Sequence, residues 1–127
     1  MVTGIEHTAI ATPDPMKLAR WYVEHLGFAI NWQPPGSTTV FVKTPDGSML
    51  EFIEGPTPLP GVAAMREPGL RHLALSVDDF EAAYRKLAAA GVQFLTAPEK
   101  SYGNSLVFFT DCDGNILHLL HRETPLP

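Results

Sequence analysis

The sequence predicts an α+β fold made of two tandem βαβββ modules, which form a curved mixed sheet with the helices on the outside. Three similarities between the two halves predict this arrangement. The segment that begins at Gly4 reads GIEHTAIATPDP and aligns with GLRHLALSVDDF, which begins at Gly69. Each half then ends its helical pattern at a glycine, and each final hairpin turns at an Asp-Gly pair. Because strand start, helix end and last turn agree in order, we interpret them as an internal repeat.

The first module, residues 4–54, alternates strand and helix signals. A strand over 4–11 is followed by a helix whose first turn contains Pro15, a residue that helix starts tolerate. Apolar residues recur at helical spacing until Gly27, which is typical of a helix end. Three further strands are predicted at 28–33, 39–44 and 48–54.

Residues 55–68 are predicted to link the modules. This segment contains four prolines, Pro56, Pro58, Pro60 and Pro68, which exclude both a regular helix and a central strand. It is too short to separate independent domains. We therefore expect residues 1–127 to form a single domain of two repeats, 4–54 and 69–121.

The second module repeats the pattern. A strand over 70–77 precedes a helix that either Asp78 or Asp79 could cap and that ends near Ala90. Strands are expected at 92–95, 105–110 and 115–121. Asp111–Gly114 is interpreted as a hairpin turn and not as a calcium loop, because the spacing and the distal glutamate of such a loop are missing.

Side-chain alternation along the strands predicts the candidate site. On the first strand of each module, His7 and His72 share the face that points away from the helix, each beside a small alanine. On the fourth strand of each module, Glu51 and His118 point to that same face. These four residues occupy equivalent positions of the repeat, so they converge if the modules pack as pseudo-symmetric partners.

Three imidazoles and one carboxylate suit zinc, iron, manganese, nickel or cobalt, and residue types alone do not choose among these metals. Taken singly, each histidine is better explained as a satisfied polar residue, and Glu51 as one end of a surface salt bridge. That explanation requires all four to occupy matched positions by coincidence. We therefore predict a divalent metal ion in the cleft of the curved sheet, held by His7, Glu51, His72 and His118.

Other polar residues receive no chemical role. His25, on the first helix, and His121, out of step with His118, are interpreted as structural or exposed. Cys112 lies in the predicted turn without an obvious base. Met49, Phe41 and Phe108 are candidates for an apolar pocket lining, and Arg66 and Arg71 are too isolated to form a basic cluster.

Composition restricts the function classes. The chain has 127 residues, one cysteine and a formal net charge of −5, which argues against nucleic acid or a membrane surface as partner. A single cysteine excludes an intramolecular disulfide. No signal peptide or membrane span is apparent, so a cytoplasmic location is the default expectation, and a small molecule is the expected partner.

Tandem βαβββ modules with these motifs resemble the vicinal oxygen chelate superfamily, which includes glyoxalase I, methylmalonyl-CoA epimerase, extradiol dioxygenases and bleomycin-resistance proteins. The segments GIEHTAI, MLEFIE, RHLALSVDD and DCDGNILHLLH resemble its first-strand, fourth-strand, fifth-strand and final-hairpin motifs. The resemblance implies the same four metal ligands and a homodimer. His118 departs from the pattern, because relatives have glutamate there, and this disfavours mechanisms with two metal-bound glutamates.

The resemblance implies three functions. The first is a metal-dependent, glyoxalase-like lyase or isomerase that stabilises an enediolate, with Glu51 as the base and His118 returning the proton. The second is an Fe(II)-dependent dioxygenase, since two histidines and a carboxylate can hold ferrous iron. The third is a non-catalytic ligand-binding protein of the bleomycin-resistance type. The resemblance leaves open whether the site lies within one chain or across two.

Overall fold

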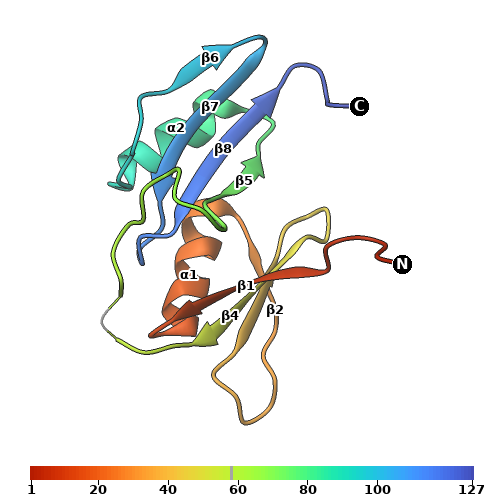
Figure 1. Cartoon of the computed structure of the whole chain (residues 1–127), viewed down its shortest axis with the longest axis vertical. Helices are drawn as coiled ribbons and strands as arrows, with labels where there is room; N and C mark the ends of the chain where they lie inside the picture. The colour runs from red at the N-terminus through yellow and green to blue at the C-terminus, as the bar shows by residue number, and fades with distance from the viewer. Residues whose placement is uncertain (58) are drawn as a thin grey trace. The chain divides into compact units, whose positions relative to one another are not determined.

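The computed structural model describes residues 1–57 and 59–127 and divides the chain into two compact units, Met1–Leu59 and Pro60–Pro127. Each unit contains one βαβββ module (Figure 1). Pro58, one of the predicted linker prolines, lies outside the described residues. No helix of the described residues is long and apolar enough to cross a membrane. That residues 1–127 form one domain stays a prediction.

Unit 1 is a four-stranded mixed sheet with one helix on one face (Figure 1). The strand order is β1-β4-β3-β2, with β1 parallel to β4 and the other neighbours antiparallel. The parallel pair requires a crossover, and α1 with the β2–β3 hairpin provides it. The elements are, in chain order, β1 (His7–Thr12), α1 (Pro15–Leu26), β2 (Ala29–Trp32), β3 (Val40–Lys43) and β4 (Met49–Glu54).

The core of unit 1 lies between α1 and its sheet. Tyr22 is fully buried, and its ring packs against those of Phe28 and Phe52 at centroid separations of 5.4 and 5.0 Å. The side chain of Asp14 caps α1 by accepting a hydrogen bond from the Lys17 backbone N–H at 3.0 Å. The helix ends at Gly27, whose φ of 75° is left-handed, as the sequence predicts.

Unit 2 repeats this topology. Its strand order is β5-β8-β7-β6, with β5 parallel to β8. Asp79, not Asp78, caps α2, since its carboxylate accepts a hydrogen bond from the Ala82 backbone N–H at 2.9 Å. The α+β class and the tandem modules predicted from the sequence are therefore confirmed. The elements are β5 (Leu73–Ser76), α2 (Phe80–Ala89), β6 (Glu99–Ser101), β7 (Asn104–Thr110) and β8 (Ile116–Arg122).

One predicted strand is wrong. Residues 92–95 form no strand but a single antiparallel bridge, between Phe94 and Phe109, and the second strand of the module is β6, further along the chain. The Phe108 backbone N–H donates to the Thr96 hydroxyl at 3.1 Å, which interrupts the backbone ladder at that point. The pairing with β7 resumes only after Pro98, which itself has no N–H to donate.

Candidate metal centre

In unit 1, β1 and β4 place His7 and Glu51 on the same face of the sheet. Ala9 pairs with Glu51, and His7 lies two residues before Ala9, so alternation gives all three one direction. That face is opposite to the buried Leu50 and Phe52, which pack toward α1. The Nε2 atom of His7 lies 3.1 Å from the Glu51 Oε2 atom, within hydrogen-bond distance.

In unit 2, β5 and β8 make the equivalent arrangement. Ala74 pairs with His118, and His72 lies two residues before Ala74, just ahead of β5. The rings of His72 and His118 are 5.4 Å apart between centroids and nearly perpendicular, at 80°. As in unit 1, the fourth-strand residues beside the site residue, Leu117 and Leu119, are buried.

An aromatic residue supports each pair from the third strand of its module. Phe41 pairs with Glu51, and Phe108 pairs with His118. Each ring meets the first-strand histidine edge to face, at 5.8 Å and 81° for His7 and at 5.1 Å and 83° for His72. The repeat detected in the sequence thus extends to the packing around both pairs. Phe41 and Phe108, which we expected to line a pocket, lie on the same face of the sheet as the pair in their unit.

The pKa values of two candidate ligands, His7 and His118, are shifted in opposite directions. A hydrogen bond to the Glu6 carboxylate is the main cause of the raised pKa of His7; desolvation opposes it, and the charges of Glu6 and Glu51 add to it. Burial, followed by the nearby His72 and Arg122, lowers the pKa of His118. His118 is therefore neutral at pH 7, with a lone pair free to bind a metal ion. The raised pKa of His7 favours its protonated form, so a metal ion that binds there competes with a proton.

The ring of His118 bears on whether the residues present would fit a metal ion. Both its ring nitrogens are shielded from solvent, and neither has a hydrogen-bond partner among the described residues. Buried polar atoms without partners are rare and costly. Stacking on Phe108, 4.3 Å away at 16°, holds the ring but satisfies neither nitrogen. A neutral imidazole beside a second imidazole is suited to coordinate a metal ion.

The structure brings the four predicted ligands together as two pairs, one in each unit. Within the described residues of either unit, no group of three or more His, Cys, Asp or Glu side chains is gathered as a complete metal site would require. Each pair alone is thus half of a tetrahedral ligand set. That the pairs share one ion stays a prediction.

The structure adds one aromatic residue to the lining of unit 1 that the alternation pattern did not identify. The register between β2 and β3 shifts after Ile30, so that Trp32 pairs with Phe41, with the ring centroids 5.8 Å apart. Because of this shift Asn31 also reaches the same side, where its amide donates to the Met49 sulfur at 3.4 Å. A β-bulge breaks strict alternation, so alternation could not have placed Trp32 in the lining. Only its large aromatic side chain could have suggested that place from the sequence.

His121, Arg71 and Asp111 have local partners. The ring Nδ1–H of His121 donates to the Val77 carbonyl at 2.9 Å, and the Arg71 guanidinium binds Glu67 at 3.3 Å. Asp111 is buried in the predicted turn between β7 and β8, where its carboxylate accepts hydrogen bonds from the backbone of Asp113 and Asn115. These contacts agree with structural roles.

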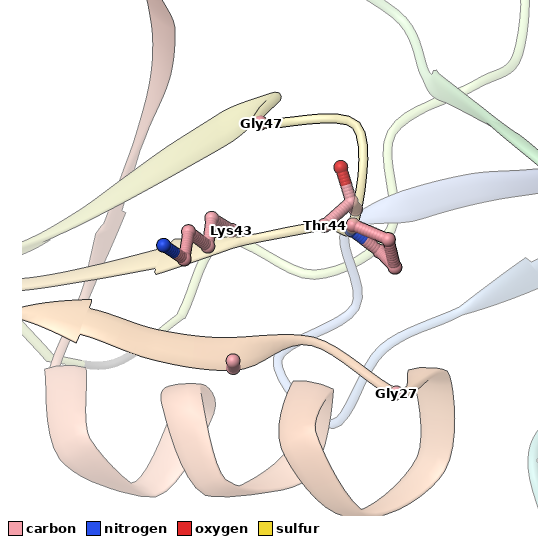
Figure 2. Close-up of a pocket in the computed structure, with 6 residues that line it drawn as sticks. Gly27, Lys43, Thr44 and Gly47 are labelled. Carbon is pink, nitrogen blue, oxygen red and sulfur yellow. The ribbon is translucent and has the colours of Figure 1, made fainter.

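A shallow pocket in unit 1 lies apart from the histidine–glutamate pair. It is formed where α1 ends at Gly27 and where the β3–β4 turn begins, as Figure 2 shows. Lys43, Thr44 and Gly47 line it together with Ala29 and Pro45. It contains no acid, histidine or thiol, so the metal chemistry is expected at the pairs and not here.

The family model of the Glyoxalase/Bleomycin resistance protein/Dioxygenase superfamily matches residues 4–119, nearly the whole chain. The chain therefore belongs to this superfamily, whose members bind small molecules and commonly bind divalent metal ions.

Individual relatives agree with this assignment. The chain is 28% identical over 126 residues to human mitochondrial methylmalonyl-CoA epimerase, covering 91% of this chain and 72% of the relative. A glyoxylase/bleomycin resistance protein/dioxygenase domain from Frankia superposes with a TM-score of 0.78 at 22% identity, covering 97% of this chain and all of that one. The antibiotic-binding protein TnmS3 from Streptomyces gives 0.74 at 22%, with 96% and 98% covered. These two structures share the fold.

Proposed function

We propose that the protein is a metal-dependent, glyoxalase-like lyase or isomerase that acts on a small substrate with adjacent oxygen atoms. In this proposal His7, Glu51, His72 and His118 hold one divalent ion, and Glu51 is the base. The observation that carries the proposal is the repeated register: each module places a histidine two residues before the alanine that pairs with a ligand-type residue of its fourth strand, so that the two side chains meet on one face.

The donor set fits a borderline divalent ion such as zinc, nickel, iron, manganese or cobalt. The chemistry that such an ion supplies when bound is Lewis-acid stabilisation of the negative charge on substrate oxygens as an enediolate forms. The neutral ring of His118, whose nitrogens have no hydrogen-bond partner among the described residues, supports this fit.

Glu51 is proposed to take the proton from the substrate carbon. Its side chain is 23% exposed and faces the open side of the sheet beside Ala9, whose small side chain leaves room for a substrate. The contact with His7 orients the carboxylate. His118, neutral at rest, is proposed to take up a proton from solvent and give it to the substrate carbon, since a lowered pKa makes its protonated form a stronger acid, and Glu51 then releases its own proton to solvent. Each residue can carry the proton only while it is not acting as a ligand.

The human relative supports the isomerase class. An epimerase inverts a stereocentre, and removal and return of a proton is the chemistry that Glu51 and His118 offer here. The difference at position 118, where the superfamily pattern has glutamate, favours two residues of different type for the two proton transfers.

Two measurements test the proposal. Elemental analysis of the purified protein should find one divalent ion per chain. Solvent deuterium should then exchange into α-hydroxy ketones or α-carboxy thioesters, which carry two oxygens placed to chelate one ion. Glu51→Gln should lower this exchange by about two to four orders of magnitude, the range of general acid–base catalysis.

The control is Glu54→Gln, at the end of the same strand, where the carboxylate accepts a hydrogen bond from the Thr38 hydroxyl. This variant should exchange at the wild-type rate. Unchanged exchange in Glu51→Gln with metal still bound would remove Glu51 from the mechanism. Oxygen uptake by iron-loaded protein with catechols would instead support a dioxygenase, and protein without stoichiometric metal would favour the ligand-binding alternative. The expected homodimer is measurable by light scattering.

A further inference from the structure

Arg122 is a charged residue on the candidate-site face of unit 2 that the proposed mechanism does not use. It is the last residue of β8, and the alternation from His118 through Leu120 gives it the same direction. It pairs with Asn104 of β7, which in turn pairs with Ser101 of β6. The three form a polar row across the sheet, next to the hairpin that joins β6 and β7.

The guanidinium of Arg122 has no acidic or hydrogen-bonding partner among the described residues. The adjacent acid, Glu123, instead pairs with Lys100 at 3.7 Å. Arg122 is nevertheless half-buried, and a partly desolvated cation without a partner is unfavourable.

An apolar row separates the polar row from His118. Leu120 pairs with Leu106, and both are half-buried on this face. Four residues of strand place the Cα atoms of His118 and Arg122 about 13 Å apart, at roughly 3.3 Å per residue. A molecule that lies along this face would therefore meet an imidazole, then an apolar step, then a guanidinium.

We infer that Arg122 binds a carboxylate of the ligand, and that the ligand is a small organic acid with an apolar segment between the carboxylate and its reactive end. The planar guanidinium forms two parallel hydrogen bonds with a carboxylate, a geometry that lysine does not offer. The net charge of −5 repels anions in general, so an anionic ligand requires a local cation of this kind. The assignment of a reactive end rests on the proposed function, whereas the carboxylate contact does not.

The test compares 3-phenylpropanoate with its neutral analogue 3-phenylpropanamide, titrated into the protein in the presence of EDTA and followed by amide and Arg Nε–H NMR signals. The acid should bind at least about tenfold more tightly, since hydrogen bonds to charged groups contribute that much. The preference should be lost in Arg122→Gln and partly retained in Arg122→Lys. The control Arg85→Gln, on the exposed side of α2, should keep it.

Equal binding of acid and amide by the wild type, or no binding of either, would overturn the inference, as would a preference that survives in Arg122→Gln. Arg122→Lys guards against a folding defect, because a folded variant with the charge should rescue part of the preference. Protein that binds no metal but still prefers the acid through Arg122 would refute the proposed function and leave this inference standing.

Discussion

Single residues in the turns of this protein contribute to stability through hydrogen bonds to carboxylates. Asp111 is 4% exposed, and its carboxylate accepts from the Asp113 and Asn115 backbone N–H groups at 2.9 Å each and from the Asn115 amide at 2.8 Å. Asp111→Ala leaves these donors without that acceptor, which should cost about 2 kcal/mol or more of unfolding free energy. Urea titration measures the loss. Asp78→Ala, at an exposed acid, should change it little.

A second turn carboxylate should show its role through pH. The Thr44 hydroxyl, followed by the Ser48 N–H and hydroxyl, lowers the pKa of Asp46 from its ordinary 3.8 to about 2. Because the folded-state pKa is the lower one, the contribution of Asp46 is fully present above pH 3.8 and disappears as pH falls through about 2. Thr44→Val should move the pKa of Asp46 back toward 3.8 in an NMR titration. An unchanged pKa would show that Thr44 is not the cause.

At the scale of elements, helix ends were predictable because capping hydrogen bonds join residues that are close in sequence. The sequence allowed either Asp78 or Asp79 as the cap of α2, and the structure shows the Asp79 carboxylate at 2.9 Å from the Ala82 N–H. Asp79→Ala should therefore lower the unfolding free energy by about 1 kcal/mol, and Asp78→Ala by close to nothing. Chemical denaturation of the two variants, which differ by one position, decides between the caps.

Strands were less predictable than helices, because pairing and not local sequence defines them. The residues of 92–95 are apolar enough to suggest a strand, yet β6 consists of Glu99, Lys100 and Ser101, whose side chains carry no strand signal. The backbone of β7 selects that segment. The register shift that turns Trp32 toward Phe41 is likewise a property of the pairing, and no periodicity in a single strand reveals it.

The β2 bulge gives a spectroscopic prediction. Trp32 is 54% exposed, whereas Trp21 packs between Tyr22 and His25, with ring centroids 5.5 and 5.0 Å away. The variant Trp21→Phe keeps only Trp32 and should be quenched strongly by acrylamide, and Trp32→Phe, which keeps only Trp21, should be quenched less. The opposite order would mean that Trp32 does not lie on the open face of the sheet.

At the scale of the whole molecule, the repeat made the two pairs of candidate ligands predictable, because duplicated strands carry duplicated registers. Ala9 opposite Glu51 and Ala74 opposite His118 are the same position in two copies. Arg122 has no such counterpart, since β4 ends at Glu54, before the equivalent position. Features that belong to one copy alone were therefore the ones that the sequence comparison did not identify.

The same reasoning predicts how metal binding depends on the two modules. If one ion uses both pairs, the double variant His7→Asn/Glu51→Gln and the double variant His72→Asn/His118→Asn should each abolish binding, because two ligands rarely hold such an ion tightly. In the wild type, added zinc should raise the melting temperature and slow amide exchange in both β4 and β8, since binding to the folded state stabilises it. If each pair bound its own ion, the stoichiometry would be two, and each double variant would keep protection in the intact module.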